Sequence, residues 1–234
     1  MSEQIESSSS GITRPALRTP RAAAVAGIIL ALLYGGSTLT IRLSVPVDLA
    51  AGTEWIARYQ GAIHISLALL PFAGIAFLWF MGVVRDRLGR WEDQFFSTVF
   101  FGSGILLIAM LFVSGALSGA LLSIYSLNPE MLHSNGVYAV NRAAIHQIAN
   151  VYGIKMAGVF MMSLGTIWLH TQIMPRWIVI ATYGLALLLI VVITFNAWIT
   201  LVFPAWVLVV SVYILLAHPD ASVKPVGEGR NVNP

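Results

Sequence analysis

Three polar side chains recur at intervals of four residues in a segment that is otherwise apolar: Arg142, His146 and Asn150. In an α-helix this spacing places all three along one stripe. A guanidinium, an imidazole and an amide on one stripe have the donors and acceptors to bind an ion or a polar substrate inside a helix bundle. Lys155 follows nine residues after His146, and this interval turns it to a nearly opposite face of the same helix.

Lys155 is the most unusual of these residues, because it lies near the middle of an apolar run over residues 145–169. A charged side chain at the centre of a membrane costs about 2.5–3.5 kcal/mol. One interpretation is a buried amine in an ion or substrate path, together with Asn150, Tyr152 and Arg142. The other is a lysine that is hydrogen-bonded in a helix interface or extends toward water. A retinal Schiff base is disfavoured, because no apolar run contains an Asp or Glu as counter-ion.

Two histidines, His64 and His146, are expected at similar depth on different helices. Such a pair is suited to axial ligation of a haem b, or to a metal site within a bundle. The alternative is two polar histidines near the outer interface without any cofactor. The sequence has no cysteine, which excludes disulfides, thiolate nucleophiles and iron–sulfur clusters. HExxH, GxSxG and P-loop patterns are also missing, so no catalytic residues are predicted.

The composition shows which elements must position these residues. Of 234 residues, 58% are apolar and 10% are charged, and the mean hydropathy is +0.82. A soluble protein of this length would need far more charged residues to cover its surface. A spanning helix needs about 20 apolar residues, and only helices or closed barrels satisfy their backbone groups in lipid. We therefore predict an all-α, polytopic transmembrane bundle of about six spans over residues 22–44, 59–83, 95–122, 145–169, 177–195 and 197–216.

The flanks of these runs define the domain organisation. The first run is longer than the apolar region of a signal peptide, so we expect it to be retained as a helix. Runs five and six almost touch, which predicts a very tight turn near 196–200 or a re-entrant segment. Residues 1–20 and 218–234 are rich in Ser, Pro or Gly and are expected to be disordered tails. The transmembrane domain is thus predicted over residues 21–217.

Lysine and arginine counts predict the orientation. One side of the membrane would carry nine of these residues and the other side three, namely Arg42, Arg58 and Arg142. Because cytoplasmic loops carry the excess, both termini are predicted to be cytoplasmic. The net charge of +3 is small and scattered over short loops, so nucleic acid is not an expected partner. The expected surroundings are the lipid bilayer of a cell inner (plasma) membrane.

A small-residue motif in the third run predicts close helix packing. Gly115 and Gly119 form a GxxxG pattern flanked by serines, which is typical of helices whose backbones approach closely. Packing inside the bundle and formation of a homodimer are both compatible with it.

The turn between the second and third runs reads Gly-Val-Val-Arg-Asp-Arg-Leu-Gly-Arg-Trp over residues 82–91. This segment resembles the GxxxDRxGRR loop motif of major facilitator transporters through Gly82, Asp86, Arg87, Gly89 and Arg90, and Trp91 replaces the final Arg. The resemblance covers ten residues. It implies a cytoplasmic turn and a transporter that would need two copies, because the full family has twice as many spans. The Arg-Gln-Gly motif of that family is not reproduced around Arg142.

The overall layout resembles small, uncharacterised multispan proteins of bacterial inner membranes, a likeness that implies no activity. We therefore expect an accessory or structural membrane protein, within a homodimer or larger membrane complex. The alternatives are a small secondary transporter working as a dimer and a membrane-bound b-type cytochrome.

Overall fold

The computed structural model describes residues 19–88, 94–134, 136–191 and 197–217. This part of the chain is helical and contains no strand, which confirms the predicted all-α class. The elements in chain order are α1 (Thr19–Ser44), α2 (Glu54–Leu88), α3 (Gln94–Leu127), α4 (Pro129–Ser134), α5 (Val137–His146), η2 (Gln147–Gly153), α6 (Ile154–Thr171), α7 (Arg176–Val191), η3 (Ala197–Leu201) and α8 (Val202–Ala217).

The helix ends follow from local sequence. Pro46 follows the end of α1, and a proline has no backbone N–H with which to continue a helix. The Asn128 side chain accepts a hydrogen bond from the Glu130 backbone N–H and caps α4. Gln172 ends α6 in the left-handed region, at φ 53°, and donates its N–H to the Trp168 carbonyl.

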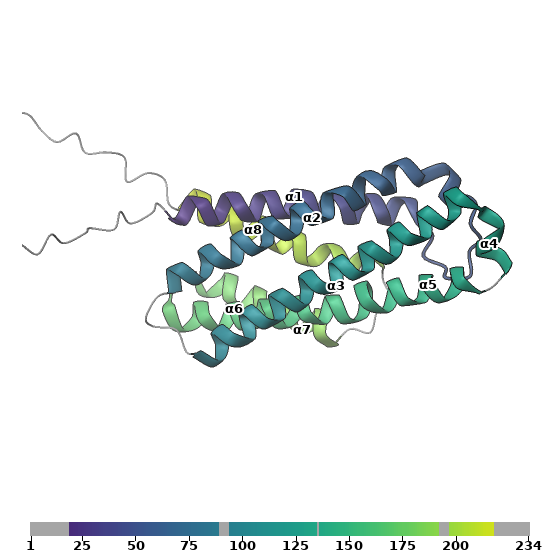
Figure 1. Cartoon of the computed structure of the whole chain (residues 1–234). Helices are drawn as coiled ribbons and strands as arrows, with labels where there is room; N and C mark the ends of the chain where they lie inside the picture. Colours follow the sequence, from purple (N-terminus) through teal and green to yellow (C-terminus); the bar gives the residue numbers. More distant parts are fainter. Residues whose placement is uncertain (1–18, 89–93, 135, 192–196, 218–234) are drawn as a thin grey trace, which may run out of the picture.

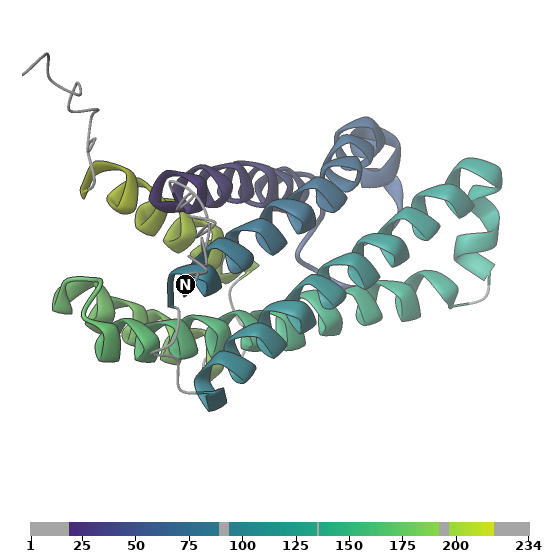
Figure 2. The same ribbon diagram turned by 60° about the vertical axis from the view of Figure 1, so that its left-hand side comes forward.

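The helices form two layers. In one layer α1 lies between α2 and α8, and in the other α6 lies between α3 and α7, while α2 and α3 also contact each other (Figures 1 and 2). The chain enters at the start of α1 and leaves at the end of α8 on the same end of the bundle (Figure 1).

Within the described ranges, five helical segments are long and apolar enough to cross a membrane: Ala22–Ser44, Glu54–Arg85, Phe95–Leu127, Val137–Thr171 and Trp198–Ala217. The helix in the fifth predicted window, α7, has 16 residues, fewer than the roughly 20 that a full crossing needs. In Figure 1, α7 and α8 stop well short of α4. The tight turn was predicted near 196–200: residue 196 lies outside the described residues, and residues 197–200 belong to the 3₁₀-helix η3.

The fourth crossing starts earlier than its apolar run. α5, η2 and α6 together form one segment over residues 137–171, whereas the run begins at residue 145. Arg142, which precedes the predicted window, is therefore inside the helix, as its spacing from His146 implied.

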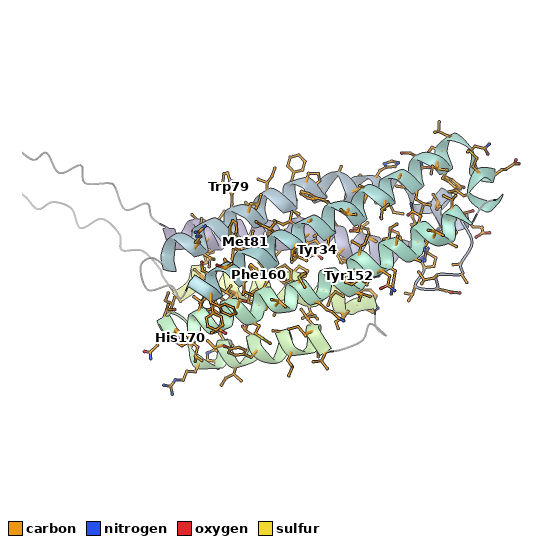
Figure 3. The ribbon with its side chains drawn as sticks, turned by 60° about the horizontal axis from the view of Figure 1, so that its bottom comes forward. Tyr34, Trp79, Met81, Tyr152, Phe160 and His170 are labelled. Atoms are coloured by element: carbon orange, nitrogen blue, oxygen red, sulfur yellow. The ribbon has the colours of Figure 1, made fainter. Side chains whose placement is uncertain are left out.

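Aromatic side chains fill the half of the bundle near the chain ends. Phe160 stacks on Phe100 with ring centroids 4.7 Å apart and meets the edge of Phe77 at 5.1 Å. Phe203 contacts Phe77 at 5.7 Å and Trp206 at 6.0 Å. These rings come from α2, α3, α6 and α8, so they join both layers. Figure 3 shows Phe160 and Met81 inside the bundle and Trp79 at its edge.

Small residues allow close helix contacts, including one in the predicted GxxxG motif. A Cβ atom at Gly115 would lie 2.9 Å from the Leu70 side chain, so α3 approaches α2 closely there. A Cβ at Gly119 would meet nothing within 4 Å. The two glycines are thus not equivalent: Gly115 packs inside the bundle and Gly119 has free space beside it.

The predicted orientation can be measured because the sequence has no cysteine of its own. Val47 is 69% exposed in the α1–α2 loop, and the exposed Arg176 begins α7 at the opposite end of the bundle. We expect Val47→Cys to react with a membrane-impermeant maleimide on intact spheroplasts, and Arg176→Cys to react only after lysis. The reverse pattern would invert the topology.

Candidate functional site: a cationic cavity

A cavity of about 190 Å³ lies between the two helix layers, in the half of the bundle that contains α4. Its walls come from α1, α2, α3, α5, η2 and η3, and the α1–α2 loop covers one end. One wall is polar and the opposite wall is apolar. The apolar wall consists of side chains from α2 and α3, chiefly Ile63, Leu67, Leu70, Leu107, Met110 and Leu111.

Arg42 is central to the polar wall. It lies near the end of α1, and its Nε donates to the Thr200 hydroxyl of η3 at 3.1 Å. Its Nη2 donates to Oδ1 of Asn150 in η2. The two N–H groups of Nη1 have no hydrogen-bond partner among the described residues, and Nη1 is not a buried atom. Half of the guanidinium fork thus remains accessible from the cavity.

Arg42 also determines the orientation of its neighbours. An arginine side chain only donates hydrogen bonds, so the Asn150 atom that faces it is the carbonyl oxygen. The amide nitrogen of Asn150 is then the atom that lies 3.0 Å from Nδ1 of His146. Because an amide nitrogen only donates, Nδ1 accepts, and a neutral His146 ring carries its proton on Nε2. His146 therefore offers a further donor.

Arg142 joins α5 to the α1–α2 loop. Its Nη2 donates to the backbone carbonyls of Pro46 at 2.9 Å and Asp48 at 3.0 Å. Its guanidinium also lies 5.4 Å from the Trp55 ring centroid, a cation–π contact. Tyr138 accepts a hydrogen bond from Arg142 and another from the Trp55 ring nitrogen. The charge of this buried residue is thus held by carbonyls and aromatic rings.

The polar stripe runs into a seven-residue π-helix, η2. π-Helices are rare and are frequently found at functional sites. Gly153 ends this segment, and a Cβ there would lie 3.2 Å from the Ile148 carbonyl oxygen. A side chain at this position would therefore be crowded against the backbone of η2.

The cavity wall combines positive charge with the absence of negative charge. Arg42 and Arg142 both line it, and no Asp or Glu is among its lining residues. His146 and Thr38 also line it. A desolvated wall of this kind attracts anions, and a guanidinium binds carboxylate or phosphate in a fork of two hydrogen bonds.

The aromatic side chains of the core separate the cavity from the other end of the bundle. Leu70, Gly153 and Thr200 are the lining residues nearest to Phe77, Phe160 and Phe203 along the chain. Phe160 is fully buried and Phe203 is 3% exposed. The cavity therefore does not extend into the half that contains the chain ends.

The structure separates the residues that the sequence grouped as one path. Asn150 and Arg142 line the cavity, together with His146. Lys155 is exposed, and Tyr152 is 56% exposed, so both lie on the outer face of the same helix.

The predicted histidine pair is not brought into one site. His64 is exposed on α2 and is not a lining residue of the cavity, whereas His146 lines it. Among the described residues, no group of three or more His, Asp or Glu is arranged to hold a metal ion.

The loop motif lies at the other end of the bundle. Gly82 is inside α2, and a Cβ there would meet nothing within 4 Å. Asp86 and Arg87 are in the last turn of α2, and Gly89 and Arg90 lie outside the described residues.

Sequence reasoning missed the contribution of Arg42. The count of lysines and arginines assigns Arg42 only to the less positive side of the membrane. In the structure it contacts Asn150, a residue 108 positions away in the chain. Its place inside the apolar window 22–44 is the one signal that could have indicated a buried role. Thr200 carried no comparable signal.

Comparison with known proteins gives no further information. No family model, no curated protein and no solved structure matches this chain.

Proposed function

We propose that this chain is a membrane protein that binds an organic anion in the cavity beside Arg42. The observation that carries the proposal is a cavity wall with two guanidiniums and, among its described lining residues, no carboxylate, facing a wall of leucine, isoleucine and methionine side chains. The polar wall would hold the anionic group and the apolar wall would hold the rest of the ligand. This is a binding role, and it fits an accessory or receptor subunit.

The size of the cavity limits the ligand. Its volume of about 190 Å³ is below the roughly 300–1,000 Å³ of pockets for drug-sized molecules. The ligand is thus a small monocarboxylate or a comparable anion with a short apolar body. Hexanoate is a suitable probe, because 1-hexanol and hexylammonium have the same tail with a neutral or a positive head.

Calorimetric titration of the protein in lipid nanodiscs tests this proposal. We expect hexanoate to bind, and 1-hexanol and hexylammonium at equal concentration to bind at least tenfold more weakly, because hydrogen bonds to a charged group contribute about 1.5–3 kcal/mol. Empty nanodiscs measure partitioning into the lipid. If 1-hexanol bound as tightly as hexanoate, the cavity would be merely apolar and the proposal would be wrong.

Transport is a second candidate function. A cavity between two helix layers, with a layer of aromatic side chains on one side, corresponds to one state of an alternating-access carrier. Uptake of labelled hexanoate by proteoliposomes would support this role. Binding without uptake would leave a receptor or accessory subunit.

We also propose a plasma (inner) membrane location and the orientation in which the cavity half faces outward. An apolar helical bundle suits that membrane, since proteins spanning bacterial outer membranes are β-barrels. The excess of positive residues at the chain-end side supports cytoplasmic termini.

A further inference from the structure

Lys155 is exposed on the outer surface of the bundle, away from the cavity. It is the second residue of α6. Gly153 and Ile154, which precede it in the chain, and Ala157, which follows it, are buried. Its ammonium has no hydrogen bond or ion pair in the part of the chain that the structure describes. Tyr152 is also exposed on this helix (Figure 3). Gln147 is exposed on it as well.

The position along the helix places Lys155 near the membrane midplane. It is 13 residues from Arg142 and 15 residues from His170, which at about 1.5 Å per residue is about 20 Å from each. The hydrocarbon core is about 30 Å thick, so these two polar residues fall at or beyond its boundaries. A lysine stem is too short to bring its ammonium from the midplane to either interface.

A charged lysine at this depth is stabilised by a negative partner, and no acidic residue of the sequence lies at this depth. The acidic residues all lie outside the apolar runs: Glu3, Glu6, Asp48, Glu54, Asp86, Glu92, Asp93, Glu130, Asp220 and Glu228. A second copy would bring another Lys155 and no carboxylate. Lipid head groups are also excluded, because they lie at the membrane surface.

We propose that the outer face bearing Gln147, Tyr152 and Lys155 is the docking surface for a transmembrane helix of another protein, which places an Asp or Glu against Lys155. Charge complementarity identifies this partner, and the Gln147 amide and Tyr152 hydroxyl add hydrogen-bonding groups on the same face. This interface is independent of anion binding in the cavity.

A peptide-association experiment tests the docking surface. The probe is a polyleucine transmembrane peptide with a single central Glu, and the matched control has Gln at that position. The protein carries a donor dye on Val47→Cys, and energy transfer to acceptor-labelled peptide is measured in phosphatidylcholine bilayers. We expect the Glu peptide to associate about tenfold more strongly than the Gln peptide.

Three substitutions of Lys155 and one control variant make the result specific. Lys155→Met should abolish the preference for the Glu peptide, whereas Lys155→Arg should retain it. Lys155→Glu should instead prefer a peptide with a central Lys, which keeps the test valid if one variant folds poorly. Trp79→Met, changed on the exposed face of α2, should behave as wild type.

Two results would overturn the proposal. One is equal association of the Glu and Gln peptides with the wild-type protein. The other is self-association of the labelled chain that disappears in Lys155→Met, since this would assign the face to a homodimer.

Discussion

Replacing Arg42 with glutamine is expected to weaken hexanoate binding by about 10- to 100-fold. Arg42 has the accessible guanidinium N–H groups of the polar wall, and a hydrogen bond to a charged partner contributes about 1.5–3 kcal/mol. Arg42→Lys keeps the charge but loses the fork geometry, so an intermediate loss is expected. The measurement is the dissociation constant from calorimetry in nanodiscs.

Arg58→Gln is the matched control for this variant. Arg58 is exposed on α2 at the same end of the bundle, lies against the Tyr59 ring and does not line the cavity. Its loss removes the same charge from the same side, so hexanoate should bind as it does to wild type. If Arg58→Gln and Arg42→Gln weakened binding equally, the effect would come from surface charge rather than from the cavity.

The second large effect is expected at the contact between α6 and α7. A Cβ at Gly158 would lie 2.9 Å from the Ala186 carbonyl oxygen and 2.7 Å from the Ile190 side chain. The carbonyl belongs to the backbone of α7 and cannot move aside without shifting that helix. Gly158→Ala should therefore lower the free energy of unfolding by about 1–3 kcal/mol, and Gly158→Val by more.

Gly165→Ala is the control on the same face of α6. Its Cβ would lie 3.4 Å from the Thr182 side chain, which is an ordinary contact distance. Because alanine favours the helix over glycine by about 1 kcal/mol, this variant should be neutral or slightly more stable. Equilibrium unfolding in dodecyl sulfate compares the two. Equal free energies of unfolding for Gly158→Ala and Gly165→Ala would show that α7 adjusts freely and that the close contact at Gly158 is not required.

Much of the fold could be predicted because lipid imposes strong local rules. Apolar runs of about 20 residues must be helical in a membrane, and these runs coincide with α1, α2, α3, α6 and α8. The shortness of α7 was harder to predict, since its apolar run continues to residue 195 and composition does not show where a helix turns back.

Periodicity by itself determined that Arg142, His146 and Asn150 share a stripe and that Lys155 faces elsewhere, because residues four apart on a helix lie on one side. Only the tertiary structure decided which side is covered. The stripe faces Arg42 and lines a cavity, whereas Lys155 is exposed on the surface of the bundle. The reason is that the contacts of Arg42 join segments 108 and 158 residues apart, and such pairings depend on how whole helices pack.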